Sequence, residues 1–263
     1  MIQGFKPKHR SRKNTEGAYL NNICENDTNQ FVAGGSDYDK LLQKCIAKDK
    51  RFRDKVFPAN TESWVGFGEV ADTQDGKLET LMKGEWMTTA EFQESVHQGD
   101  AKPYPFSTGA IKTRDIKMGY DIGDSYFLSG LSSMCGIPEL VERVFVTREI
   151  SKYAIYCVAL FVNGAWESVV LDSTFPVDTE TGEVNTWMCA ENRDKNGIWV
   201  MLVEKAWAKV HGGYLNIDGG FVIEAITALT GAPSRMYFLK DPNADEEKKE
   251  EKPPHVNWEE DDD

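Results

Sequence analysis

The stretch of this chain best suited to chemistry centres on Ser125, in the sequence Gly123-Asp124-Ser125-Tyr126. A glycine turn comes first, and the apolar and small residues after it predict a buried helix over residues 122–136. A serine hydroxyl becomes a nucleophile only if a base takes its proton during the attack. The other interpretation is that Ser125 caps the helix by accepting a hydrogen bond from a first-turn amide. We favour the cap, or a packing role, over a reactive serine.

Several other segments carry apolar residues at helical spacing. Helices are predicted over residues 37–56, 86–92, 137–145, 198–209 and 221–229. Pro138 suits the first turn of its helix, and Gly231 would close the last helix in a left-handed conformation. These helices, with the one that follows Gly123, would form most of the folded part of the chain.

One β-hairpin is also predicted. Residues 153–162 and 165–171 are rich in apolar and β-branched side chains, and Asn163-Gly164 between them favours a two-residue hairpin turn. Residues 176–182, which begin with a proline, are expected to form a loop. The combination of helices with a hairpin predicts an α+β fold.

The segment 198–209 has the strongest apolar stripe in the chain. We expect this stripe to pack against the helix that starts at Ser125, with the hairpin closing one side. The residues of this predicted core are Trp199, Leu202, Val203, Ala206 and Trp207 on the stripe, Phe127, Leu128 and Leu131 on the facing helix, and Trp166 and Val169 in the hairpin.

Length and charge narrow the classes of function. The chain has 263 residues, enough for one large domain or two small ones, and a net charge of −13. Such an acidic chain is a poor nucleic-acid binder, and no apolar run approaches the ~20 residues that span a membrane. Residues 1–13 nevertheless carry five basic residues and no acid, so this basic arm could contact an acidic partner surface. Residues 241–263 are strongly acidic and predict a disordered tail or linker.

The five cysteines are widely spaced and form no CxxC pair. This pattern indicates neither a zinc site nor a disulfide framework. Reduced, mostly buried thiols in a cytoplasmic protein are the expectation.

Several motifs, in the right order, resemble the protease core of the calpain family of cysteine proteases. Gly123-Asp124-Ser125-Tyr126 is similar to the family's Gly-Asp-Cys-Trp, and residues 202–209 to its Leu-Leu-Glu-Lys-Ala-Tyr-Ala-Lys. Residues 164–172 resemble its Gly-x-Trp-x-x-Val-x-Val-Asp hairpin. The resemblance covers residues 37–240. It implies a papain-like fold of which only the first, mainly helical subdomain is present, between an extended arm over 1–36 and the acidic tail.

The departures from the family pattern bear on activity. Ser125 stands where the family has its nucleophilic cysteine, whose thiol ionises far more readily than a serine hydroxyl. The glutamine that helps to form the family's oxyanion hole is missing, with Met118 or Gly119 near its place. The family's catalytic histidine and asparagine belong to a second subdomain, for which the sequence leaves no room. His255 and Asn257 are interpreted as residues of the acidic tail.

His211, which follows the segment 198–209, is interpreted as a surface or capping histidine. A Ser-His-acid triad therefore has no good candidate in this chain.

The resemblance also bears on calcium. Asp115 is similar to one carboxylate ligand of the family's first calcium site, but Gly197 stands where the second carboxylate is expected. Because affinity depends on ligand charge and number, we expect weak calcium binding at most, and no other cofactor.

These observations predict a catalytically inactive calpain-like domain that acts as a structural or protein-interaction subunit. Its setting would be a larger cytoplasmic assembly, with the cytoskeleton and the cilium axoneme as family-level candidates. The alternative is a subunit or fragment of a calcium-dependent cysteine endopeptidase whose histidine and asparagine lie on another chain or beyond the C-terminus. A cysteine codon at position 125 in the native gene would favour that alternative.

Overall fold

The computed structural model describes residues 38–65, 79, 81, 83–91, 111–119, 122–178, 186–193 and 197–237. The predicted arm 1–36 and the acidic tail 241–263 lie outside the described residues, as do His255 and Asn257.

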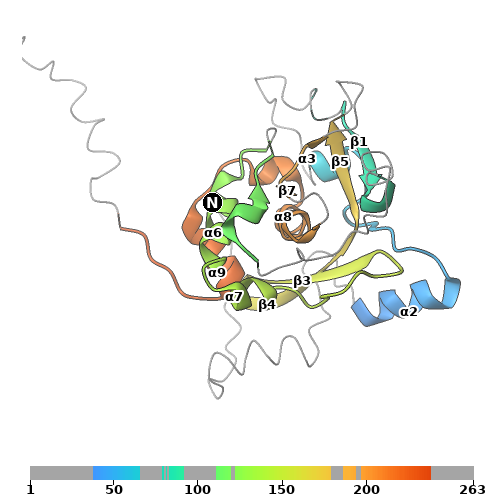
Figure 1. Cartoon of the computed structure of the whole chain (residues 1–263), viewed down its shortest axis with the longest axis horizontal. Helices are drawn as coiled ribbons and strands as arrows, with labels where there is room; N and C mark the ends of the chain where they lie inside the picture. Colours follow the sequence, from blue (N-terminus) through green and yellow to red (C-terminus); the bar gives the residue numbers. More distant parts are fainter. Residues whose placement is uncertain are drawn as a thin grey trace, which may run out of the picture.

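Helix α8 (Trp199–Val210) lies at the centre of the molecule (Figure 1). Figure 1 shows it end-on, with α6 (Ser125–Met134) and α9 (Val222–Thr230) on one side and the hairpin below. Every residue from Trp199 to Lys209 is buried. The helix that the sequence predicts is confirmed, but the one-sided stripe is wrong, because α8 is enclosed all round and its charged side chains are buried too.

The hairpin is as predicted. Strands β3 (Ile155–Val162) and β4 (Ala165–Asp172) pair antiparallel, from Ile155 opposite Asp172 to Val162 opposite Ala165. Asn163 and Gly164 both have positive φ, 52° and 75°, which is the two-residue turn that suits the twist of a hairpin. The inner part of both strands is fully buried against α8 and α9.

A second sheet has the order β1-β5-β6, from strands β1 (Glu85–Thr88), β5 (Thr174–Asp178) and β6 (Thr186–Trp187). Two predictions are corrected here. Pro176, expected to begin a loop, lies within β5 opposite Trp86. The predicted short helix is a strand as far as Thr88, since β1 pairs with β5 over that stretch.

The predicted cap of that short helix is nevertheless present. The side chain of Glu91 accepts the amide of Thr88, and the Thr88 hydroxyl accepts the amide of Glu91. This reciprocal pair is a capping box.

Helices α6 and α9 pack closely against each other. A Cβ on Gly130 would lie 2.9 Å from the Cβ of Ala225, so a glycine is required at this contact. Gly231 ends α9 with a φ of 68°, as predicted. Helix α7 (Pro138–Glu142) has its proline in the first turn.

Shorter elements complete the described chain: α2 (Tyr38–Lys48), α3 (Glu62–Val65), η1 (Thr113–Asp115), β2 (Ile116–Lys117), β7 (Glu191–Asn192) and η2 (Tyr214–Ile217). Strands β2 and β7 pair with each other. The helix predicted over 37–56 is too long. It ends at Lys48, because Asp49 takes a φ of 45° and the chain then runs extended.

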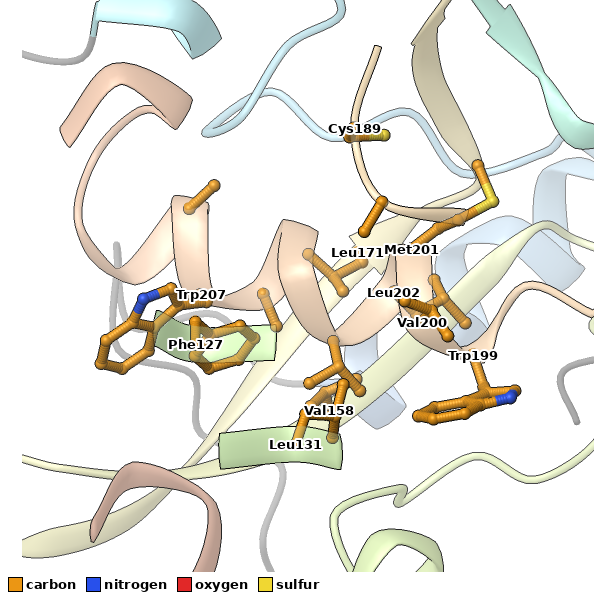
Figure 2. Close-up of a cluster of buried hydrophobic side chains, with 14 of the residues drawn as sticks. Phe127, Leu131, Val158, Leu171, Cys189, Trp199, Val200, Met201, Leu202 and Trp207 are labelled. Atoms are coloured by element: carbon orange, nitrogen blue, oxygen red, sulfur yellow. The ribbon is translucent and has the colours of Figure 1, made fainter. Parts of the chain in front are cut away.

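The predicted core contact is confirmed. The rings of Phe127 on α6 and Trp207 on α8 are stacked with centroids 4.9 Å apart, and Figure 2 shows them side by side. Val169 is fully buried. Trp166 is only half-buried and lies at the end of α9, where its ring is about 3 Å from the place of a Cβ on Gly231.

The described residues thus form a mixed helix and strand domain with small sheets, in agreement with the predicted α+β class. Within the described chain no helix is both long and apolar enough to cross a membrane.

Candidate functional site

Ser125 is the first residue of α6 and is exposed to solvent. The carbonyl of Asp124 accepts the amides of Phe127 and Leu128, at 2.8 and 3.1 Å, and these bonds start the helix. The N-cap is therefore Asp124, and the prediction that Ser125 caps α6 is wrong. No described hydrogen bond holds the Ser125 hydroxyl, which stands at the surface of the first turn.

The turn before Ser125 lies against the chain before α9. The Gly219 amide donates to the Gly123 carbonyl at 2.9 Å. A Cβ on Gly123 would lie 2.0 Å from an Asp218 carboxylate oxygen, and one on Gly220 would lie 2.5 Å from the Tyr126 ring. The Gly123-Asp124-Ser125 turn and the Gly219-Gly220 segment therefore approach more closely than residues with side chains would allow.

An aromatic chain leads from Tyr126 to His211. Trp207 Nε1 donates to the Tyr126 hydroxyl at 2.9 Å, and the His211 ring lies 4.0 Å from the Trp207 ring. Nδ1 of His211 is 2.9 Å from the Trp207 carbonyl oxygen. Partial burial of the ring lowers the pKa of His211, so the imidazole is neutral at pH 7. His211 is the single histidine in the part of the chain that the structure describes, and its hydrogen bond goes to its own helix, where it lies at the C-cap of α8.

At Gly119, one of the two residues expected near the place of the family's oxyanion-hole glutamine, the backbone makes a close contact. A Cβ on Gly119 would lie 2.5 Å from the carbonyl oxygen of Met188, so this residue passes directly over the chain before β7. Met118 beside it is exposed. Neither residue has a side-chain amide that could donate to an oxyanion.

One buried acid belongs to the turn before Ser125, and a second lies near it on α8. Asp124 and Glu204 are 1 % and 0 % exposed and lie near each other. The Ala190 amide donates to both carboxyl oxygens of Glu204, at 2.9 and 3.1 Å. Burial and the neighbouring Asp124 raise the pKa of Glu204 well above its ordinary value. Sequence reasoning missed this pair because Glu204 lies among apolar residues and gives no local signal of a polar partner.

Two lysines on α8 are buried in ion pairs with strands and loops. Lys205 donates to a carboxylate oxygen of Asp172 and to the Thr174 carbonyl, both at 2.6 Å. Lys209 donates to Asp54 at 2.5 Å and to the Val170 carbonyl at 2.7 Å.

The two pairs are joined, because the Asp54 amide donates to Asp172. Burial lowers the pKa of Lys209 to about 8, although Asp54 opposes the shift. This polar network holds two segments against α8: the chain after α2 and the start of β5.

The two residues considered for calcium each contact the chain at or next to β7. The carbonyl of Asp115 accepts the Arg193 amide at 2.8 Å, and a Cβ on Gly197 would lie 2.7 Å from the Asn192 side chain. The Asp115 carboxylate accepts the Lys112 amide at 2.8 Å, within its own turn. Among the described residues no group of three histidine, cysteine or acidic side chains could hold a metal ion.

Comparison with known sequences identifies the family. Residues 52–256 match the family described as calpain family cysteine protease. The chain belongs to the calpain family of cysteine proteases.

The relatives of this calpain-family chain include plant and animal proteins. The calpain-type cysteine protease ADL1 of Oryza sativa subsp. japonica is 30% identical over 205 residues, which is 78% of this chain and 9% of the relative. The calpain-type cysteine protease DEK1 of Arabidopsis thaliana is 32% identical over 196 residues, 74% of this chain and 8% of the relative. The calpain-1 catalytic subunit of Gallus gallus is 31% identical over 238 residues, 88% of this chain and 30% of the relative. The chain thus spans less than a third of each of these relatives.

Proposed function

We propose that this calpain-family domain does not catalyse peptide hydrolysis and serves as a structural or protein-binding part of a larger cytoplasmic assembly. The observation that carries the proposal is Ser125, an exposed serine at the first position of α6, where the family resemblance expects a cysteine. A helix N-terminus promotes ionisation of a thiol but not of a serine hydroxyl. Ser125 would therefore need a nearby general base to act as a nucleophile.

The surroundings of Ser125 support the proposal. Nδ1 of His211 is hydrogen-bonded to the Trp207 carbonyl of its own helix, at the C-cap of α8. The acid next to the serine, Asp124, is buried and lies near a second acid, Glu204. Around Gly119 the backbone contact with Met188 leaves no space for an amide side chain.

The test is an activity assay with and without calcium. We expect the chain to leave casein and fluorogenic calpain peptides intact, and the Ser125→Cys variant to do the same, because a thiol alone lacks its general base. The Ser125→Cys variant should still react with iodoacetamide at residue 125, which shows that the new thiol is accessible, and a thermal melt like that of the unchanged chain would show that it is folded. Turnover by Ser125→Cys above that of a Ser125→Ala control would overturn the proposal.

The alternative function is a fragment or subunit of a calcium-dependent cysteine endopeptidase. It is favoured by the names of the relatives, which are calpain-type proteases, and by the short share of their length that this chain covers. Sequencing the native transcript tests this alternative. A cysteine codon at position 125 would mean that Ser125 replaces a native cysteine. Mixing the Ser125→Cys chain with candidate partner chains and measuring peptide cleavage is the second test.

The cellular setting is tested separately. We expect a tagged chain to sediment with a detergent-extracted cytoskeleton or with isolated axonemes, and to remain there after a low-salt wash. Recovery of the whole tagged pool in the soluble fraction would contradict the proposed assembly.

A further inference from the structure

Helix α2 and the extended chain after it carry a concentration of basic residues on their outer side. Residues 38–56 include seven lysines and arginines and three aspartates, although the whole chain has a net charge of −13. All seven basic residues are exposed to solvent. Together they form what we call the basic surface: Lys40, Lys44, Lys48, Lys50, Arg51, Arg53 and Lys55.

The apolar side of α2 determines which way its lysines face. This side lies against the body of the protein, and its residues are partly or fully buried: Tyr38, Leu41, Leu42 and Cys45. Lys40, Lys44 and Lys48 follow one another at intervals of four residues, so they line one exposed flank of the helix over about 12 Å. Figure 1 shows α2 at the edge of the molecule, on the opposite side of the view from α9.

In the extended chain after α2, inward and outward residues alternate, as is usual for extended backbone. Asp54 is buried in its ion pair with α8, and Phe52 is half-buried. Arg51, Arg53 and Lys55 alternate with these two residues and are exposed. The buried ion pair therefore holds this segment in a register that places its basic residues on the outside.

The described acids near the basic surface compensate only part of its charge. Asp49 is paired with Lys152, which lies outside the basic surface, at 3.1 Å. Arg51 and Arg53 lie near the carboxylate of Glu91. Within the part of the chain that the structure describes, four of the lysines take part in no ion pair: Lys44, Lys48, Lys50 and Lys55.

The acidic tail 241–263 has the complementary charge. It contains eleven acidic residues and three lysines, and its last five residues, Glu259 to Asp263, are all acidic. Residues 57–240 contain 25 acidic and 15 basic residues, so they repel the tail, whereas the basic surface attracts it.

The tail is also long enough to reach α2. It lies outside the described residues, which extend to Tyr237. Residues 238–259 can span up to about 75 Å when extended. A domain of about 200 residues is only about 40 Å across. The acids at 259–263 can therefore reach the far side of the molecule.

We propose that the acidic tail 241–263 binds the basic surface of the same chain and covers it. Single exposed ion pairs are weak, so the contact depends on several charges acting together. Attachment to the same chain makes the contact intramolecular and favours it over binding of a separate peptide. An acidic partner has to displace the tail before it reaches the same lysines. The proposal involves no reaction at Ser125, so its failure and the failure of the proposed function are distinguishable.

The first experiment couples carboxylates to lysine amines that touch them, using a zero-length carbodiimide on the dilute 263-residue chain. Coupled residues in the monomer band are identified by mass spectrometry. We expect the tail to couple to Lys44, Lys48, Lys50 or Lys55 at about 20 mM salt. Most of this coupling should be lost at about 1 M salt, where charges are screened beyond about 3 Å.

Lys112 is the internal control, because it is exposed and lies outside the basic surface. We expect it to couple to the tail with a much lower yield. Three results would overturn the proposal: no coupling of the tail, equal coupling to Lys112 and to the basic surface, or coupling that occurs only in dimers.

The second experiment measures whether the tail occupies the basic surface. The probe is a dye-labelled peptide with the sequence of residues 241–263, and fluorescence anisotropy reports its binding at low salt. The wild type is compared with a tail-neutral variant, which carries Glu259→Gln, Glu260→Gln, Asp261→Asn, Asp262→Asn and Asp263→Asn. We expect the tail-neutral variant to bind the peptide about threefold or more tightly, because its basic surface is no longer covered. Equal affinities would overturn the proposal.

Two triple variants, made in the tail-neutral chain, locate the binding site. The first carries Lys44→Gln, Lys48→Gln and Lys55→Gln, and we expect it to bind the peptide about tenfold more weakly. The matched control removes the same charge from exposed positions elsewhere, with Lys112→Gln, Arg148→Gln and Arg235→Gln. It should change the affinity by about twofold or less. Thermal melts should show that both variants are folded. Equal weakening by the two variants would indicate attraction to net charge alone and would overturn the proposed site.

Discussion

Helix α8 buries charge in two different ways. On the side of β4 and β5, Lys205 and Lys209 meet Asp172 and Asp54, and opposite charges compensate each other. On the side of α6, Glu204 lies near Asp124, and burial together with Asp124 raises the pKa of Glu204 well above its ordinary value. The difference teaches that contacts on one side of α8 should stabilise the folded chain less in acid. Contacts on the other side should stabilise it less as pH rises.

The ion pairs should be the most costly to break. Lys205→Met removes the cation and leaves the Asp172 carboxylate buried without its partner. We expect a loss of about 3–5 kcal/mol in the free energy of unfolding, measured by urea denaturation at neutral pH. The double variant Lys205→Met with Asp172→Asn should recover part of the loss. A loss below about 1 kcal/mol in the single variant would put the pair among surface ion pairs and contradict its buried geometry.

Trp207→Ala is the uncharged reference for the comparison. It removes the stack on Phe127 and the hydrogen bond to Tyr126, at the end of α8 nearest to α6. We expect a loss of about 3–5 kcal/mol, as for other buried tryptophans truncated to alanine. Thermal melts at two pH values should show the same loss at both, since no ionisable group is removed. A neutral effect would mean that the core contact drawn in Figure 2 is not formed in solution.

The ion pairs on α8 should stabilise the folded chain less in acid. Burial alone would raise the pKa of Asp172, but Lys205 and the amides of Asp54 and Thr174 outweigh it and lower the pKa below its ordinary value. The stability from this group is present above the ordinary aspartate pKa of about 3.9 and is lost as pH falls through the folded value. Acid titration of the wild type should show this loss, and Asp172→Asn should lack that part of it. An acid limb of equal depth in both chains would contradict the prediction.

Asp115, at the edge of the described structure's small β2–β7 pair, tests the calcium expectation. Asp115 is half-buried, and its carboxylate accepts one amide within its own turn. With Gly197 in place of a second carboxylate, we expect no micromolar calcium binding by isothermal titration calorimetry. Stoichiometric micromolar binding that Asp115→Ala abolishes would show that other ligands complete the site.

The smallest effect is expected at Ser125. Because Asp124 and not Ser125 is the N-cap, Ser125→Ala removes no capping bond. We expect a change within about 0.5 kcal/mol in the free energy of unfolding, as for surface substitutions away from special contacts. A loss near the ~1 kcal/mol of a removed cap would restore the capping role that the sequence first suggested.

Much of the local structure could be predicted from the sequence. The turn at Asn163-Gly164, the end of α9 at Gly231 and the first turn of α7 at Pro138 depend on backbone preferences of single residues. Motif resemblance similarly indicated the calpain family, which the comparisons confirm. These signals lie within a few residues of the feature they determine.

Other features depend on contacts between distant segments, and only the tertiary structure decided them. Pro176 lies in a strand because β1, far away in the chain, pairs with it. Asp124 is the N-cap of α6 and is buried near Glu204.

The strongest case is α8, whose apolar stripe predicted one buried face. The sequence determines that this segment is helical, since helical periodicity is a local property. It does not reveal that Glu204, Lys205 and Lys209 are buried as well, because the partners that make their burial tolerable come from segments about 30 to 155 residues away, apart from Ala190. The cost of burying a charge is set by what lies opposite, and that is determined only when the chain has folded.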